Sequence, residues 1–361
     1  MSTAREAGQW PQSIQQPPAA ASTRSSAEAA SSAPSSLVEA ASFAPSSLVE
    51  AASFAPAVPS GSSAPMGAPH RLDGNAIRWP AHTPSRAARR GWRDLDVRLL
   101  EVVGRLTERD RAICRLLDEH RVLTAAQVAD AYFAGGRRAR MRLRELYALD
   151  VLDRFRPRRG GSAAPFHFVL GPLGAALVAA EQASDLADVA WRRRAAAELA
   201  ASQRLAHLVG TNGFFCALLR AARTQDGCAL SVWWSERRCS AEWGTVVRPD
   251  GYGVWTEGQT TLPFLYEHDN GTERLERLGK KLEGYVRLAR AAGHPNWVLF
   301  SFPTPRREAD ARRVLAHPLV PVATTARSAT FAPDAPVWLP ARTGGPRRSL
   351  AGLADVPLGD R

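Results

Sequence analysis

The pattern of apolar and polar positions predicts two folded blocks, at about 90–185 and 190–326. In the first block, apolar residues recur at helical spacing in TERDRAICRLLDEH and again in TAAQVADAYF. Each stretch opens with a threonine that is followed three residues later by Asp or Gln. This spacing is typical of a capping box, in which side chain and backbone at the start of a helix satisfy each other. We therefore predict helices that begin after Thr107 and Thr124.

A third helical stretch and a hairpin follow in the first block. In RRARMRLRELYAL the helical period turns Ala139, Leu143 and Leu146 inward. The next stretch, VLDRFRPRRGGSAAPFHFVL, has two β-rich runs around a Pro/Gly turn, as in a hairpin. Three helices and a hairpin in this order predict a winged helix-turn-helix, which can place its third helix in the major groove of DNA.

Arginine is concentrated on this predicted DNA-reading surface. Residues 121–160 contain ten Arg and four acidic residues, and Arg can donate paired hydrogen bonds to guanine edges or bind phosphates. The predicted DNA contacts are Arg137, Arg138, Arg140, Arg142 and Arg144 on the third helix, and Arg156, Arg158 and Arg159 on the wing. The alternative is a solvated basic face on a winged helix that binds other proteins.

The second block has the pattern of one long helix followed by three strands, a helix and a strand. The long helix covers about 191–223, with a break expected near Gly210. The three strands are expected at 229–236, 244–255 and 262–269. A helix from Thr272 to about Ala292 precedes the buried strand WVLFSF, and a helix at 306–315 and the strand VPVATT complete the block. The order α-β-β-β-α-β is that of PD-(D/E)xK restriction-endonuclease-like domains, so the predicted class is α/β (α+β).

Nucleases of this kind hold Mg²⁺ between carboxylates on adjacent strands and keep a lysine near the attacking water. The second strand carries RPD, which ends at Asp250, and alternation along YEHD puts Glu267 and Asp269 on one face of the third. We predict that Asp250 and Glu267 bind the metal and that Asp269 assists catalysis. The alternative is that RPDG and DNGT are ordinary turns, with Thr272 as the N-cap of the next helix.

The usual lysine is missing, because EHD stands where ExK would. The chain has 47 basic residues, of which two are lysines, Lys280 and Lys281, both on the following helix. Lys281 lies about 80° from the centre of the inward face marked by Leu278 and Leu282, and Lys280 lies nearly opposite that face. We therefore predict Lys281 as the catalytic lysine and Lys280 as a solvent or phosphate contact. His207 is expected to have a structural role at a helix end.

The composition favours a polyanionic partner. A net charge of +12 makes nucleic acid the first candidate. The four cysteines have no CxxC spacing, so neither a zinc site nor a disulfide framework is indicated, and a reducing cytoplasm fits. The N-terminus lacks an apolar signal core, and no apolar run reaches the length that spans a membrane.

Low-complexity tails flank the two blocks. Residues 1–88 are rich in Ala, Ser and Pro, contain APSSLVEAASF twice, at 33–43 and 44–54, and are expected to be disordered. The Pro/Gly-rich stretch 327–361 is expected to be a flexible tail.

A resemblance to a known family rests on four stretches: LTERDRAICRLLDEHRVLTAAQVADAYF, RLAHLVGTNGFF, VRPDGYG and FLYEHDNGTERLERLGKKLEGY. Together they resemble the replication-relaxation family of actinobacterial plasmids and integrative elements, over about 105–325. The resemblance implies a role in plasmid replication, DNA relaxation or mobilisation. It implies double-stranded DNA and other plasmid replication or transfer proteins as partners, and it supplies no established catalytic residue.

Two functions stay open on these residues. In the first, the winged helix docks a Mg²⁺-dependent DNA endonuclease that uses Asp250, Glu267, Asp269 and Lys281. In the second, the chain is a non-catalytic DNA-binding accessory factor or transcriptional regulator with a degenerate nuclease-like scaffold. The missing ExK lysine favours the second function, and the retained lysine pair favours the first. Dependence on a divalent metal separates them.

Overall fold

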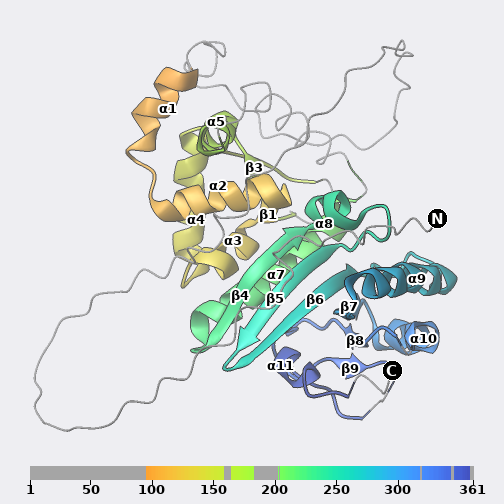
Figure 1. Ribbon diagram of the computed structural model, residues 1–361. Helices are drawn as coiled ribbons and strands as arrows, with labels where there is room; N and C mark the ends of the chain where they lie inside the picture. The colour runs from red at the N-terminus through yellow and green to blue at the C-terminus, as the bar shows by residue number, and fades with distance from the viewer. Residues whose placement is uncertain are drawn as a thin grey trace, which may run out of the picture. The chain divides into compact units, whose positions relative to one another are not determined.

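The computed structural model describes residues 95–157, 164–182, 202, 204–317, 319–342 and 345–357. These residues form a mixed α/β fold with a three-stranded sheet in the order β1-β3-β2 and a six-stranded sheet in the order β4-β5-β6-β7-β8-β9 (Figure 1). The predicted tail at 1–88, with its duplicated segment, lies outside the described residues, as do Arg158 and Arg159, which were predicted as wing contacts.

The first block carries both predicted helix starts. Its elements are α1 (Leu95–Val103), α2 (Glu108–His120), β1 (Leu123–Thr124), α3 (Ala125–Tyr132), α4 (Gly136–Ala148), β2 (Leu152–Phe155), β3 (His167–Leu170) and α5 (Pro172–Glu181). Thr107 and Thr124 are the N-caps of α2 and α3, each with a complete capping box. Helices α1 and α5 are additions to the predicted set.

The inward face of α4 and the hairpin are confirmed. Ala139, Leu143 and Leu146 are fully buried in the core. Strands β2 and β3 pair antiparallel, with Leu152 opposite Leu170, and the short β1 adds to the free side of β3. The four-residue strands therefore lie against the helices and close the core of the block.

One arginine of α4 is anchored inside the first block. Arg142 donates from Nε and a terminal nitrogen to the two oxygens of Asp110, at 2.9 and 2.6 Å, and also to the backbone oxygen of Arg105. The Asp110 carboxylate is fully buried, and it also accepts from the backbone and hydroxyl of Thr107. This contact corrects the expectation that Arg142 faces outward for DNA.

The second block contains the long mixed sheet. Its elements are α7 (Leu205–Thr224), β4 (Cys228–Ser235), α8 (Glu236–Trp243), β5 (Gly251–Glu257), β6 (Thr260–His268), α9 (Leu275–Ala292), β7 (Trp297–Phe302), α10 (Pro305–Leu315), β8 (Val322–Ala326), β9 (Leu339–Pro340) and α11 (Leu350–Leu353). Strands β4, β5 and β6 pair antiparallel, and β7 and β8 add in parallel. The chain order is the predicted one, with α8 inserted between the first two strands.

Three boundaries in this block differ from expectation. Helix α7 runs through Gly210 without a break. The glycine instead lets the helix lie close to the sheet, since a Cβ at this position would lie 2.2 Å from Nε2 of His268. The second strand starts at Gly251 rather than 244, because α8 runs to Trp243 and residues 244–250 form the turn and loop that lead from this helix into the strand. Helix α9 starts at Leu275 rather than at Thr272, after a turn in which Gly271 has φ of 81°.

The stretch after 327 is packed where it is described, contrary to the expected flexible tail. Strand β9 joins the edge of the sheet, and Trp338, Leu350 and Leu353 are fully buried. Arg347 pairs with the buried Glu308 of α10 at 2.7 Å. The apolar residues between the prolines and glycines thus complete the core under the sheet.

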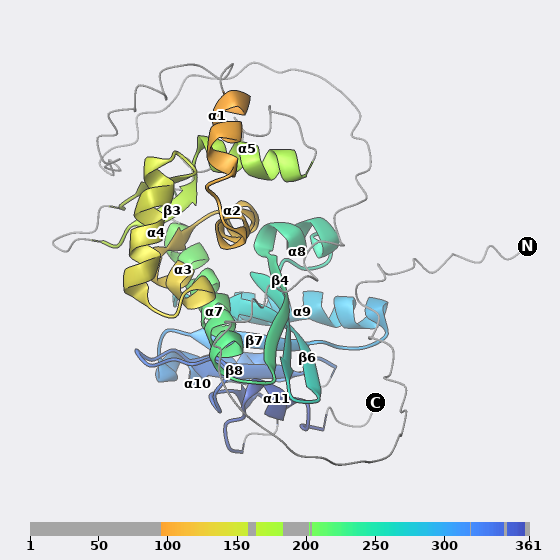
Figure 2. The same cartoon turned by 90° about the vertical axis from the view of Figure 1, so that its left-hand side faces the viewer.

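Helix α7 connects the two blocks. It lies between α3 and the strands β4 and β6 (Figure 2). Asn212 donates to the backbone oxygens of His120 and Val122, at 3.1 and 2.8 Å, and Gln127 donates to Val209 at 2.6 Å. Among the described helices, α7 is the one long and apolar enough to span a membrane by length and composition, but half of its apolar window is buried in the fold.

The anchoring role of Arg142 generates a stability prediction. Arg142→Gln should lower the free energy of unfolding by about 2–4 kcal/mol, because it leaves the Asp110 carboxylate buried without its cation. Urea unfolding followed by circular dichroism measures the loss. Arg144→Gln is the matched control on the exposed side of the same helix, and it should change stability by less than about 0.5 kcal/mol. Equal effects of the two substitutions would contradict the anchoring role.

Candidate functional site

Two carboxylates meet at one end of the large sheet. Gly251 of β5 pairs with Tyr266 of β6, so the register extended by one residue sets Asp250 opposite Glu267. The backbone nitrogen of Asp250 donates to the Tyr266 oxygen at 3.1 Å, which continues the ladder. Asp250 is 8% exposed and Glu267 is 3% exposed. Two of the predicted site residues are therefore buried neighbours.

Helix α7 supplies the partner of Asp250. His207 lies in its first turn, and its Nε2 is 3.0 Å from one oxygen of Asp250. The other oxygen accepts the backbone N–H of His268 at 2.8 Å. Burial alone would raise the pKa of Asp250, but the His207 hydrogen bond, the nearby Lys281 charge and the His268 N–H lower it to about 2. Asp250 is thus ionised across the physiological range.

Helix α9 supplies the partners of Glu267. Lys281 donates to one oxygen of Glu267 and Tyr285, one turn further on, donates to the other. Lys280 is exposed, and the Lys281 side chain is 28% exposed. The structure therefore brings Lys281 to the acid pair and leaves Lys280 outside it.

The surroundings of Glu267 shift the pKa values of this carboxyl group and of its two partners, Lys281 and Tyr285. Burial, with the Asp250 charge adding to it, raises the pKa of Glu267 to about 8, even though the Lys281 ammonium and the Tyr285 hydroxyl oppose this rise. Burial would lower the pKa of Lys281, but the charges of Glu267 and Asp250 raise it, so the amine stays protonated. Burial, followed by the Glu267 charge, raises the pKa of Tyr285, which keeps its proton and acts as a donor.

Asp269 lies apart from this pair in its contacts. Its carboxylate accepts from Arg307 of α10 at 2.9 Å and from the backbone N–H of Gly271. The backbone nitrogen of Asp269 donates to the backbone oxygen of Ser301 at 3.0 Å, and the backbone oxygen of Asp269 accepts a hydrogen bond from the Arg327 guanidinium. Asp269 therefore shapes the turn between β6 and α9, although strand alternation alone groups it with Glu267.

Several residues of the site were not singled out from the sequence. Tyr285 was not among the predicted site residues, and His207 was expected to have a structural role. His268 is buried against α7, and its Nδ1 lies 3.2 Å from the Tyr266 hydroxyl. The i, i+4 spacing of Lys281 and Tyr285 could have placed Tyr285 beside Glu267, whereas nothing local to RLAHLVG indicates that His207 reaches Asp250.

The acid pair fits a small hard cation. Mg²⁺ binds protein through one or two carboxylates and completes its shell with water and phosphate oxygens. Asp250, directly before β5, and Glu267 of β6 provide two such ligands, and each of their oxygens already accepts one protein hydrogen bond. Within the described ranges, no group of three or more His, Cys, Asp or Glu side chains is placed to hold a metal. The fit is therefore to a two-carboxylate site.

A basic face lies on the first block. Four predicted DNA contacts of α4 are exposed: Arg137, Arg138, Arg140 and Arg144. Arg156 at the end of β2 is also exposed, and its guanidinium lies 3.8 Å from the ring centre of Phe166. Arg142 is not part of this face.

Comparison with known proteins gives one finding. A family model described as Replication-relaxation matches residues 114–297, a range that contains α4, Asp250, Glu267 and Lys281. No curated protein and no solved structure matches the chain significantly.

The His207–Asp250 contact generates a pH prediction. Burial would lower the pKa of His207, but the hydrogen bond and charge of Asp250 raise it. The stabilisation from this pair is therefore fully present below the unfolded histidine pKa of about 6.5 and is lost as pH rises through the folded value. In Asp250→Asn the pKa of His207 should fall, even though Glu267 and Glu236 still act on it. An NMR titration of the histidine Cε1–H signals measures this shift.

The His207→Gln variant assigns the signal in that titration. An unchanged His207 pKa in Asp250→Asn would mean that the contact is not formed in solution.

Proposed function

The chain belongs to the replication-relaxation family, and from this premise we propose that it binds double-stranded DNA during the replication, relaxation or mobilisation of a plasmid or another mobile element. The family model covers both the basic helix α4 and the acid pair. Other replication or transfer proteins of the same element are the proposed partners. The net charge of +12 supports a polyanionic ligand.

We propose that the first block docks the DNA as a winged helix-turn-helix. The support is the order α2, α3, α4 and the β2–β3 hairpin, together with the exposed arginines of α4. In such a fold α4 enters the major groove, where Arg can read guanine edges, and the wing lies on the backbone. Arg137, Arg138, Arg140 and Arg144 are the proposed groove contacts, and Arg156, Arg158 and Arg159 the wing contacts.

We propose that the second block is a PD-(D/E)xK-like nuclease domain. One observation carries this proposal: Asp250 and Glu267 are buried opposite each other, and the ammonium of Lys281 is held on Glu267. The element order α7-β4-β5-β6-α9-β7 supports it. Lys281 would then occupy, from the following helix, the place of the lysine that the ExK pattern lacks.

The proposed roles follow from the contacts. Asp250 and Glu267 would hold Mg²⁺, which when bound stabilises charge on the phosphoryl group and favours ionisation of a water. Lys281, protonated and held by Glu267, can orient the attacking water or donate to a phosphate oxygen. His207 fixes the Asp250 carboxylate from the other side. Asp269, held by Arg307 and Arg327, would assist by keeping the end of β6 in position.

The alternative proposal is a non-catalytic DNA-binding accessory factor. A specific observation favours it: all four oxygens of Asp250 and Glu267 accept hydrogen bonds from protein groups. Such saturated carboxylates also suit a structural ionic cluster that only stabilises the sheet end. Metal-dependent cleavage of DNA would require these oxygens to bind a metal through their remaining lone pairs. A purely structural cluster has no such requirement.

A plasmid assay tests the proposal. Wild-type protein with supercoiled DNA and Mg²⁺ or Mn²⁺ should produce nicked or linear DNA, and EDTA should stop the reaction. Asp250→Asn and Lys281→Arg should each reduce the rate by at least about 100-fold, the usual range for a lost acid–base or charge-stabilising group. Lys280→Arg is the matched control and should retain the rate.

A gel shift on the same four proteins reports binding separately. DNA that shifts but stays intact with all of them would establish the accessory factor instead.

A further inference from the structure

Arginine side chains and aromatic rings alternate between the last turn of α4 and the β2–β3 hairpin. The guanidinium carbon of Arg154 lies 4.3 Å from the ring centre of Tyr147 and 4.1 Å from that of Phe166. The guanidinium carbon of Arg156 lies 3.8 Å from the same Phe166 ring centre. A cation at such a distance is attracted by the electrons of the ring face. These four side chains, called the hairpin stack below, therefore connect α4 to the hairpin.

Strand alternation explains why both arginines reach the same ring. Arg154 of β2 and Arg156, directly after this strand, are two residues apart, so their side chains point to one face of the hairpin. Phe155, between them, points to the other face and is fully buried. Phe155 pairs with His167 of β3, so the register extended by one residue sets Arg156 opposite Phe166. The hairpin thus has an apolar face in the core and a basic, aromatic face beside α4.

No carboxylate among the described residues forms an ion pair with either guanidinium of the hairpin stack. Nε of Arg154 is buried and has no hydrogen-bond partner among those residues, so the two rings hold this side chain. Arg156 is exposed, and a guanidinium stacked on a ring keeps its N–H groups at the edge of its plane. Two like charges on one ring repel each other, and together they favour the binding of an anion.

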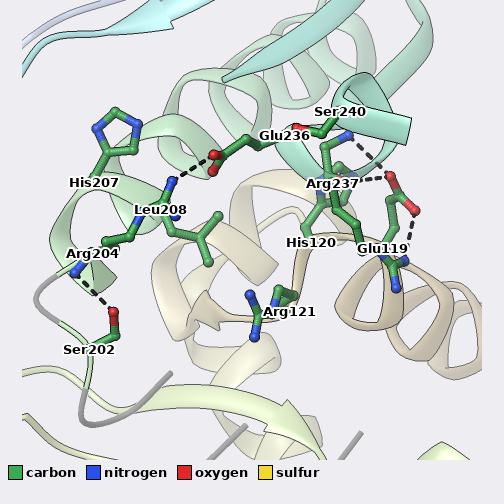
Figure 3. Close-up of a pocket in the computed structure, with 11 residues that line it drawn as sticks. Glu119, His120, Arg121, Ser202, Arg204, His207, Leu208, Glu236, Arg237 and Ser240 are labelled. Atoms are coloured by element: carbon green, nitrogen blue, oxygen red, sulfur yellow. Dashed lines mark hydrogen bonds and ion pairs between the residues drawn. The ribbon is translucent and has the colours of Figure 1, made fainter. Parts of the chain in front are cut away.

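The arginines of the pocket between α2, α7 and α8 show the contrast (Figure 3). Arg204 pairs with Glu236 at 2.6 Å, and Arg237 pairs with Glu119 at 3.3 Å. The charges of these two guanidiniums are therefore balanced within the protein. Arg156 has no such partner in the described part of the chain, so its donors are open to an anion from solution.

The hairpin stack continues a stripe of arginines on α4. Arg137, Arg140, Arg144 and Tyr147 follow one another at intervals of three or four residues, so they lie along one side of the helix. The three arginines are exposed, and Tyr147 at the end of the stripe is the first ring of the stack. Arg156 therefore extends this basic stripe from the helix onto the hairpin.

We propose that Phe166 is a positioning residue for DNA binding: its ring holds the Arg156 guanidinium beside α4, where this group donates to a backbone phosphate. The inference rests on the proposed function, in which α4 lies in the major groove and the hairpin lies on the DNA backbone. Arginine suits this contact, because its planar fork stacks on a ring with its face and donates pairs of hydrogen bonds to phosphate with its edge. Arg154, in contact with both rings, ties Phe166 to Tyr147 of α4.

Fluorescence anisotropy with a labelled duplex of mixed sequence tests this role on the full chain. The measurements are made in EDTA over a series of salt concentrations, so cleavage plays no part. Phe166→Leu removes the ring without changing the charge and should weaken binding about three- to fivefold, as expected for an exposed cation–π contact. Phe166→Tyr keeps the ring and should bind as the wild type does. Arg156→Gln should weaken binding about tenfold and lower the slope of log affinity against log salt by about 1.

The double variant of Phe166→Leu and Arg156→Gln separates positioning from an independent effect of the ring. It should bind like Arg156→Gln alone, because the ring acts through this guanidinium. Effects that multiply would instead overturn the proposal. Arg313→Gln on α10, whose side chain is 76% exposed, is the charge control and should change neither affinity nor slope.

The remaining outcomes separate this proposal from the proposed function. If the wild type binds DNA while Phe166→Leu or Arg156→Gln keeps its affinity, the role of Phe166 is overturned and the proposed function stands. If circular dichroism shows that Phe166→Leu does not fold, Arg156→Lys takes its place. This variant keeps the charge and the salt slope but loses the planar fork, so binding as tight as that of the wild type would overturn the proposal. If the wild type does not bind DNA, both proposals fail together.

Discussion

Burying Asp250 and Glu267 beside each other places two carboxyl groups where water has little access, so the negative charge at the site must be balanced by nearby donors. The strands provide one of the four donors, the backbone N–H of His268, and the other three come from helices. Helix α7 contributes His207 and helix α9 contributes Lys281 and Tyr285. Both helices therefore approach this end of the sheet to balance the negative charge of Asp250 and Glu267.

The close approach of α7 depends on Gly210. Any side chain at that position would meet the ring of His268, whose backbone N–H also holds Asp250. On the other side of α7, Asn212 and Gln127 tie the helix to the turn after α2 and to α3. The basic helix α4 packs on α3, which packs on α7, so α7 is linked to α4 through α3 and to the acid pair through His207.

Local rules gave much of the fold, and long-range contacts account for what they missed. The capping boxes at Thr107 and Thr124 depend on residues three apart, and the WVLFSF strand on a continuous apolar run, so all three were predictable. Lys281 was distinguished from Lys280 by helical angle alone. In contrast, Arg142 pairs with Asp110 from another helix, and His207 reaches Asp250 from a different element. No local pattern encodes such contacts, and the Pro- and Gly-rich stretch around Trp338 packs through partners equally far along the chain.

The central claim is that Glu267 and Lys281 are one coupled unit, and a double-mutant cycle tests it most directly. Urea unfolding of the wild type, Glu267→Gln, Lys281→Met and the double variant gives their interaction free energy. We expect about 2 kcal/mol or more, because each single change leaves the other charge at the site unpaired. The parallel cycle with Lys280→Met should give close to zero. A Glu267–Lys281 coupling below about 0.5 kcal/mol would contradict the account.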